Sequence, residues 1–440
     1  MSDFVSQAAA YAPENTLEWL APVQKHNAEV WEKVSFPHRK SEDWKYTSLR
    51  VLEKGEVCSA SPEVRALDDT IVAGADISGL DCFDVVFVNG VYDKALSSPL
   101  ETLPEGTVFA TFSGAEADVQ SDIAAALGSI AKDAKHIFAA LNASKLNDGV
   151  YIRVAKNTKI EKAFRVLNVT LSQAQGATVS PRVLLSIGES AEATLIEQFV
   201  SDDAAQSNFV NSVTELDVQA NAKLKHYRLH LEDDSALHVG GLHVNLAASA
   251  VIDSFHFALG GKLKRIDCVV NHLGAGAHCE MGGVYLPRHK QHVDYHTTIE
   301  HAVPHCTTNE VFRGIIADEA KAVFNGRIHI HKDAQKTFAQ LSNKNLLTSN
   351  KAEIDTKPEL EIYADDVQCA HGATVAQLNE TSMHYLRTRG VSEKEARMML
   401  SFGFINELIN NINDKAVADY LRPQIAELFS RDPVDLESLL

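Results

Sequence analysis

The 440-residue chain lacks the short motifs that mark most nucleotide-binding and hydrolytic enzymes. It has no G-x-x-x-x-G-K-[ST] sequence and no strand-linked G-x-G-x-x-G, so no standard phosphate cradle for ATP or a dinucleotide is visible. H-E-x-x-H and G-x-S-x-G are absent as well, which removes the usual signatures of zinc proteases and serine hydrolases. We therefore expect any chemistry to come from a less stereotyped group of residues, or from a partner protein.

Cysteine is scarce and unpaired in sequence. The six cysteines, none of them in a C-x-x-C pair, are Cys58, Cys82, Cys268, Cys279, Cys306 and Cys369. This scatter argues against a secreted disulfide framework and against a zinc knuckle. We expect free thiols, most of which would act as small buried hydrophobic side chains.

Targeting and charge signals are missing too. The start of the chain has no basic segment followed by an apolar one, and no apolar run approaches the roughly 20 residues that span a bilayer. The formal charge of −18 is spread along the chain without a basic stripe. We expect a cytoplasmic protein that binds neither nucleic acid nor membrane.

The residue pattern divides the chain into three regions. Residues 1–149 are mainly helical, with a hairpin predicted at 83–98 by two β-rich runs around Asn89-Gly90. Residues 150–380 contain short β-branched runs with almost no helix. Residues 381–440 return to helix, beginning at Ser392 with Glu395 three residues later, which is the pattern of a capping box. The fold class is therefore mainly β, with helical regions on both sides.

A loose repeat favours a solenoid over a sandwich or barrel for the β region. Alanines stand at the start of successive candidate strands, separated by 29, 28 and 27 residues and later by 45 and 30 residues. They are Ala193, Ala222, Ala250, Ala277, Ala322 and Ala352. Small side chains at one point of each coil would let successive backbones stack closely.

Histidine is concentrated in one part of this region. Seven lie between 272 and 305, namely His272, His278, His289, His292, His296, His301 and His305. His329 and His331 follow on an apparent strand, where they would point to one face. A metal could use them, with further ligands between His301 and Cys306, but ordinary surface histidines are the simpler interpretation.

The clearest candidate site is Cys369-Ala370-His371. On a strand, Cys369 and His371 would project from the same face with Cα atoms about 6.5 Å apart, within reach of one metal ion or one cluster edge. Thiolate is a soft ligand and imidazole suits iron. Two ligands do not complete an iron site, so we expect the others elsewhere in this chain or in a second one.

At these residues the sequence closely resembles the SufB/SufD family of the Suf iron–sulfur cluster assembly system. The matching segments are Phe312–Ile315, Val323–Gly326, Asp333–Thr337, Ser342–Leu347, Lys357–Val367, Cys369–Val375, Tyr385–Gly390 and, near the start, Arg39–Thr47. Glycine after His371 and the modest chain length favour the SufD branch.

The resemblance implies a right-handed parallel β-helix and a non-catalytic scaffold role. It also implies a SufB-like paralogue as partner, paired through the β-helical cores, and a SufC-like ABC ATPase bound to the C-terminal helical region. His371 matches the family histidine implicated in building the nascent cluster at the SufB–SufD interface, and Cys369 matches a neighbour. The cluster would be transient and shared, with no tightly bound cofactor. A flavin in the complex and a homodimer of the isolated chain are both compatible with the resemblance.

Two other functions remain open from the residues. A carbohydrate-active β-helix enzyme would need paired carboxylates, but the adjacent Asp365 and Asp366 would face opposite ways on a strand. A metal-storing homodimer would use the many histidines, and would bind iron stoichiometrically as an isolated chain.

Overall fold

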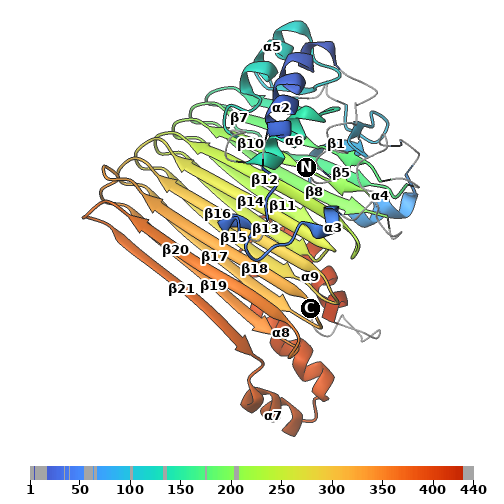
Figure 1. The fold of residues 1–440 in the computed structure, drawn as a ribbon, viewed down its shortest axis with the longest axis vertical. Helices are drawn as coiled ribbons and strands as arrows, with labels where there is room; N and C mark the ends of the chain where they lie inside the picture. Colours follow the sequence, from blue (N-terminus) through green and yellow to red (C-terminus); the bar gives the residue numbers. More distant parts are fainter. Residues whose placement is uncertain are drawn as a thin grey trace.

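The computed structural model describes residues 4, 17–33, 35–38, 40–53, 63, 67–99, 103–131, 136–173, 176–202 and 208–429. Its centre is a parallel β-helix made of two facing sheets, with helices at both ends of the chain (Figure 1). The predicted mainly β fold with a parallel β-helical core is confirmed. Cys58 and Arg39, which the sequence analysis used, lie outside the described residues.

Ten strands of the described chain form one sheet, here sheet 1. In spatial order they are β2 (Val91–Tyr92), β1 (Cys82–Val88), β5 (Ala163–Thr170), β8 (Glu192–Ser201), β11 (Lys223–His230), β13 (Val251–Leu259), β15 (His278–Leu286), β17 (Thr307–Ile316), β19 (Phe338–Leu347) and β21 (Gln368–Gln377).

Eleven strands of the described chain form the facing sheet, here sheet 2. In spatial order they are β20 (Glu353–Ile362), β18 (Lys321–Ile330), β16 (His292–His301), β14 (Leu263–His272), β12 (Leu237–Leu246), β10 (Val213–Val218), β7 (Arg182–Ile187), β4 (Val150–Val154) and β3 (Val108–Thr111), with the short β6 (Thr178–Val179) and β9 (Phe209–Val210) beside them.

From β10 onward, successive strands of the chain alternate between the two sheets, so each coil adds one strand to each. Every second side chain points between the sheets, because strand side chains alternate. In β18, for example, Ala322, Phe324, Ile328 and Ile330 are all buried in the main core cluster. The β-branched runs in the sequence form these strands because they fit a pleated surface that is buried on its inner face.

One corner of the coil repeats with a regularity that the alanine spacing only partly captured. Just before a strand of sheet 1, a residue with positive φ is followed by a small, fully or almost fully buried residue. The six pairs are Ser190-Ala191, Asn221-Ala222, Ser249-Ala250, Gly276-Ala277, His305-Cys306 and Lys336-Thr337. The N–H of the corner residue bonds to the next coil; for example, Asn221 donates to Ala248 at 2.9 Å and His305 donates to Gln335 at 2.9 Å.

This corner corrects the predicted repeat. Lys223, the residue after Ala222, pairs with Glu192, the residue after Ala191. The alanine that is equivalent to Ala222 is therefore Ala191, and the predicted Ala193 lies two residues further along the chain. Ala322 and Ala352 lie at the start of β18 and before β20, in sheet 2, while Cys306 and Thr337 continue the sheet 1 series. The prediction was wrong there because it followed alanine, whereas the corner requires only a small or compact buried side chain.

The N-terminal region contributes strands as well as helices. Its helical elements are η1 (Glu18–Leu20), α2 (Ala21–Lys33), η2 (Glu42–Trp44), α3 (Arg50–Glu53), α4 (Asp69–Ala75), α5 (Ala117–Ala126) and α6 (Ile137–Ser144). The predicted hairpin is confirmed as β1 and β2, with Asn89 and Gly90 both at positive φ in its turn. β1 also pairs in parallel with β5, so sheet 1 begins inside this region.

Three helices follow the last strand: α7 (Glu380–Thr388), α8 (Glu393–Asn410) and α9 (Lys415–Phe429). The predicted capping box at Ser392 and Glu395 is confirmed. Helices α8 and α9 lie against the outer face of sheet 1, where Ile405, Ile409 and Leu421 share one apolar cluster with Tyr227 and Phe257. Among the described helices, none is both long enough and apolar enough to cross a membrane.

Candidate functional site

The last coil leaves both sheets with an open edge. Strand β21 ends sheet 1 and pairs only with β19, and β20 ends sheet 2 and pairs only with β18, within the described residues. In β21, nine of the ten residues are exposed, whereas the strand that it pairs with is half buried. An edge strand presents a row of unpaired N–H and C=O groups, so this end of the β-helix is available for pairing with another strand.

Cys369 and His371 both lie on β21. Cys369 is in register with Ala339 and His371 with Leu341, and those two β19 residues point into the core. Cys369 and His371 therefore share one face of β21, as the spacing predicted, and that face is the interior side at the open end of the β-helix. Cys369 is half-buried against the core, and His371 is exposed.

The surroundings of Cys369 favour the protonated thiol. Burial raises its pKa above the ordinary value, against a smaller opposing effect of the Ala339 backbone. Iron binding would have to displace this proton, because the thiolate is the metal ligand. In the described part of the chain, neither Cys369 nor His371 belongs to a convergent group of three metal-ligating side chains. As metal ligands, the two side chains would therefore form an incomplete set.

Large apolar side chains are exposed around the same end. Ile362 ends β20 and Tyr363 follows it, while Val375 lies on β21 and Phe338 on β19; their exposed fractions are 42%, 63%, 48% and 39%. Exposed apolar groups of this size beside an unpaired edge are typical of a protein contact surface.

The other described cysteines are free thiols, as predicted. Cys268, Cys279 and Cys306 are buried inside the β-helix, and Cys82 is half-buried at its other end. Burial raises the pKa of the Cys82 thiol to about 12, with Asp84 adding to the effect. These four thiols are therefore protonated, inert side chains.

The histidine-rich stretch does not converge on one site, and its members in and next to sheet 2 divide between the two faces of that sheet. His272 and His301 stack inside, with ring centroids 4.2 Å apart, and burial lowers the pKa of His301 to about 2. His329 and His331 lie outside, where both contact Glu300. The structure does not bring His301 or Cys306 to them. The sequence analysis missed Glu300, whose only signal was its position one residue before His301.

Charged residues also lie between the two sheets, which the sequence analysis did not foresee. Arg228 donates to Glu197 at 2.6 Å, and Lys264 donates to Glu232 at 2.8 Å, with all four side chains buried. Burial alone would raise the pKa of Glu197, but the charge of Arg228 and the hydrogen bonds from His226 and Thr214 outweigh it and hold the pKa at about 2. The interior is thus filled partly by matched charges.

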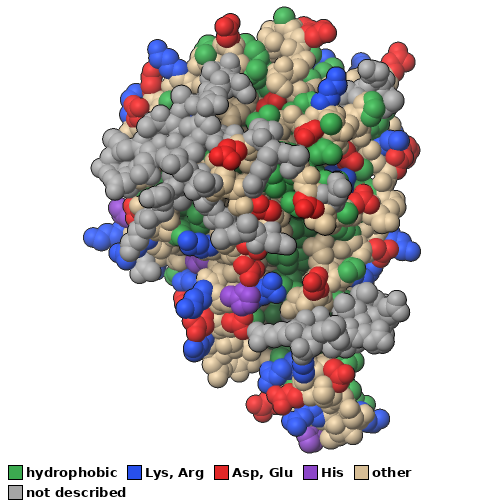
Figure 2. Space-filling view, turned by 90° about the vertical axis from the view of Figure 1, so that its right-hand side faces the viewer, with side chains coloured by type: hydrophobic (Ala, Val, Ile, Leu, Met, Phe, Trp, Pro, Cys, Tyr) green, Lys and Arg blue, Asp and Glu red, His purple; other side chains and the backbone are tan. Residues whose placement is uncertain are grey.

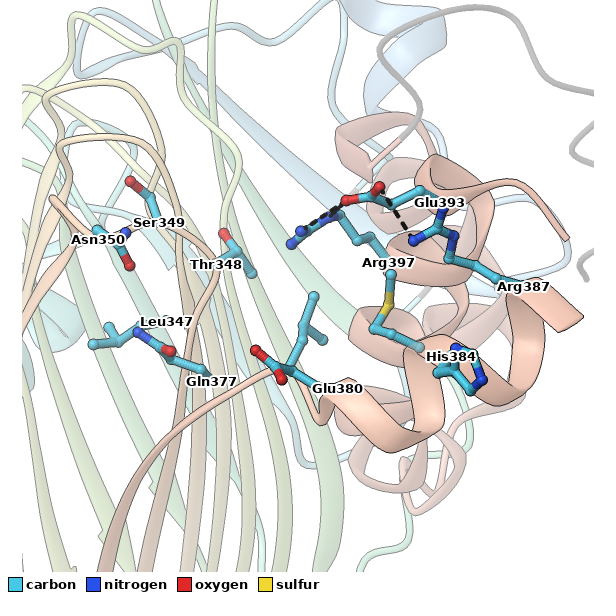
Figure 3. A pocket seen from close by; sticks show the side chains of 12 residues that line it. Leu347, Thr348, Ser349, Asn350, Gln377, Glu380, His384, Arg387, Glu393 and Arg397 are labelled. Carbon is cyan, nitrogen blue, oxygen red and sulfur yellow. Dashed lines mark hydrogen bonds and ion pairs between the residues drawn. The ribbon is translucent and has the colours of Figure 1, made fainter.

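A cavity of about 540 Å³ lies where the β-helix meets helices α7 and α8 (Figure 3). Glu393 lies between Arg387 and Arg397, pairing with them at 3.9 and 3.0 Å. These side chains are about half exposed, and Met383 is the only buried residue of α7. Helix α7 is therefore held to the β-helix by few buried contacts.

On the face that Figure 2 shows, acidic and basic side chains are interspersed, and no extended patch carries charge of one sign. This agrees with the absence of a basic stripe in the sequence.

Comparison with known proteins identifies the family. The model of the SUF system FeS cluster assembly SufBD core domain matches residues 169–404, and that of the SufBD protein N-terminal region matches residues 2–166. The chain is 31% identical to the iron-sulfur cluster assembly protein SufD of Escherichia coli (strain K12), over 92% of each chain. It is 29% identical to an iron-sulfur cluster assembly SufBD family protein of Synechocystis, over 88% of this chain and 86% of the relative.

A plant protein, the chloroplastic ABCI7 of Arabidopsis thaliana, is 26% identical over 97% of this chain and 90% of its own length. The two family models together cover most of the β-helix and the region before it. The chain therefore belongs to the SufB/SufD family of iron–sulfur cluster assembly proteins.

Proposed function

We propose that the chain is a SufD-type, non-catalytic scaffold subunit of a cytoplasmic iron–sulfur cluster assembly complex. The nascent cluster forms where the open end of its β-helix meets a SufB-like paralogue. The observation that carries this proposal is that Cys369 and His371 stand on the unpaired edge strand β21 as an incomplete ligand pair. Membership of the SufB/SufD family supplies the chemical context.

The composition of β21 supports pairing with a second β-helix. Its sequence, QCAHGATVAQ, contains no Asp, Glu, Lys or Arg over ten residues. Sheet edges that stay unpaired are normally blunted by charges, proline or short length. The neighbouring edge strand β20 carries such features, including Pro358 and Lys357, whereas β21 carries none of the three. An uncharged edge of this length is suited to continue into another sheet.

Cluster chemistry fits the two side chains. A thiolate and an imidazole are both iron ligands, and neither alone holds a cluster. The cluster is the cargo of the complex, so it must be released as well as bound. A set of ligands that is complete only when a second chain contributes to it allows both. Cys369 remains protonated until iron arrives, which protects the thiol from oxidation meanwhile.

Coupling to ATP needs a partner, since the chain has no phosphate-binding motif. A SufC-like ABC ATPase would dock on the C-terminal helices, where Tyr385 of α7 and Met399 of α8 are 56% and 41% exposed. Helix α8 also packs on sheet 1. A movement of the docked ATPases would thus be transmitted to the β-helices and open their shared end. In this view the interface between the β-helices has two states, and ATP binding shifts the equilibrium between them.

Reconstitution tests the ligand assignment. The complex with the paralogue and the ATPase is prepared with His371→Ala or Cys369→Ser, and cluster formation and ATPase activity are measured anaerobically. We expect His371→Ala to reduce cluster formation at least tenfold, and Cys369→Ser to reduce it less, with the complex still assembled.

Matched controls are available in the same chain. His289→Ala removes an exposed histidine from the turn before β16, and Cys82→Ser removes a half-buried thiol at the other end of the β-helix. Both should leave cluster formation unchanged. Normal cluster formation with His371→Ala would remove that histidine from the proposed mechanism.

An experiment on the isolated chain distinguishes the metal-storage alternative from the proposed function. Anaerobic titration with iron and sulfide should give little coloured product if the ligands are shared with a second subunit, and stoichiometric product if the chain stores iron alone.

A further inference from the structure

A second set of metal-ligating side chains lies on the outer face of sheet 2, away from Cys369 and His371. Its three members are Glu300 on β16, His329 on β18 and His331 directly after β18. Parallel pairing of β16 with β18 places Glu300 opposite His329. His331 is two residues further along and so points to the same face.

The donor atoms converge on one point. The Nδ1 atom of His329 lies 2.6 Å from Glu300 Oε2, and the Nε2 atom of His331 lies 2.8 Å from the same oxygen. The two rings are neighbours, with centroids 4.2 Å apart. Tetrahedral zinc would hold such atoms about 3.3 Å apart. An ion therefore fits after the His329 contact opens by about 0.7 Å and the His331 contact by about 0.5 Å. Side-chain rotation at the half-exposed His331 permits the second of these movements.

A second layer of contacts orients the carboxylate. Arg327 donates to Glu300 Oε1 at 3.1 Å, which leaves Oε2 for the histidines. The charge of Arg327 is in turn matched by Glu361 on β20, through two hydrogen bonds of 2.8 and 2.9 Å. Metal-binding carboxylates are commonly fixed in this way by an outer shell of hydrogen bonds.

The other convergent group in the described chain is unsuited to a metal. His230, Glu232 and His238 are buried between the sheets, and Lys264 already supplies a cation to Glu232 at 2.8 Å. The outer group, in contrast, has side chains 18%, 19% and 45% exposed for His329, Glu300 and His331, so an ion can reach it from solvent.

We propose that Glu300, His329 and His331 form a binding site for a divalent first-row transition-metal ion of the zinc or ferrous type. Two imidazoles and one carboxylate select such ions over calcium and magnesium, which prefer oxygen ligands alone. The remaining coordination positions face solvent. The site is independent of the proposed cluster site, because it shares no residue with it and lies on the opposite sheet.

The test titrates the purified full-length chain with Co²⁺ as a spectroscopic probe, and with Zn²⁺ in competition. We expect one Co²⁺ per chain without the thiolate-to-cobalt charge-transfer absorption that a cysteine ligand produces. Glu300→Gln and His331→Ala should each weaken binding at least tenfold. His331→Ala is the safer variant, because this side chain lies beyond the strand and is 45% exposed.

Two controls separate this site from other histidines. His289→Ala removes an exposed histidine that contacts a single carboxylate, Asp234, at 2.8 Å, and should change the affinity less than twofold. His371→Ala should also change the affinity for Co²⁺ less than twofold. Unchanged affinity with both Glu300→Gln and His331→Ala would overturn the assignment, as would a thiolate absorption band or a loss of binding with His371→Ala.

Discussion

Arg313 on β17 joins the β-helix to helix α8 by bonding Glu407: its guanidinium lies 2.5 Å from the Glu407 carboxylate. The same guanidinium donates to the Phe404 carbonyl at 2.5 Å and lies over the Phe404 ring at 5.6 Å. Arg313 is almost fully buried, so one side chain makes a hydrogen bond, an ion pair and a ring contact between the two parts.

Arg313→Ala should loosen α8 while the β-helix stays intact. We expect a loss of about 1–3 kcal/mol in the free energy of unfolding, because a buried charged donor and its packed stem are removed. Hydrogen exchange should accelerate across 393–410 and not across the strands. Arg397→Ala, which removes a half-exposed arginine of α8 itself, is the control. If hydrogen exchange in α8 were equally slow in Arg313→Ala and in the wild type, the apolar contacts of α8 alone would hold it to the β-helix, contrary to this prediction.

Glu197→Gln should destabilise the β-helix by about 3–5 kcal/mol, because it leaves the buried Arg228 without its counter-charge. Urea unfolding measures the loss. Glu192→Gln on the same strand, whose partner Lys223 is 62% exposed, should have no measurable effect. A small loss for Glu197→Gln would mean that water or neighbouring groups reach Arg228.

Glu310 should make stability depend on pH near neutrality. Burial raises its pKa from 4.5 to about 7, despite the hydrogen bond from Thr297. The folded chain therefore binds a proton more tightly than the unfolded chain, and this stabilisation, complete below pH 4.5, is lost as pH rises to about 7. The loss is on the order of 3 kcal/mol.

Glu310→Gln should remove this slope. Urea unfolding of both proteins at pH 5 and pH 8 is the measurement, with the variant expected to be the more stable protein only at pH 8. Glu319→Gln, at an exposed carboxylate, serves as the control. A wild-type advantage at pH 8 would indicate that Glu310 is ionised and paired there.

Val375→Asp should weaken association with the proposed SufB-like paralogue at least tenfold, because it places a charge on the uncharged edge strand β21. Val375 is 48% exposed, so the isolated chain should keep its thermal stability. Analytical ultracentrifugation of the mixed chains measures the association. Leu273→Asp, at a leucine that is 54% exposed but distant from β21 in the coil order, is the matched control. Equal weakening by both variants would contradict a specific edge contact.

Local signals in the sequence predicted the elements that depend on neighbouring residues. The hairpin turn at Asn89-Gly90 and the capping box at Ser392 and Glu395 are both confirmed, because each is fixed by a few adjacent side chains. The placement of Cys369 and His371 on one face also follows from strand alternation alone.

Features that depend on pairing between coils were not predictable. Glu300 meets His329 only because β16 and β18 pair in one register, 29 residues apart in the chain. Glu197 and Arg228 look like surface charges in sequence, and only the inward face of their strands makes them a buried pair. A shift of one residue would exchange inside and outside at every such position, and composition does not determine that choice.

The uncharged strand β21 has a cost for the cell as well as a use. Two such edges can join to each other as readily as to the proposed paralogue, and because β21 lies at only one end of sheet 1, the product is a closed pair of chains. If the proposed counterpart exists, chains made in excess of it would be withdrawn as such pairs, so this edge would favour balanced synthesis of the two subunits.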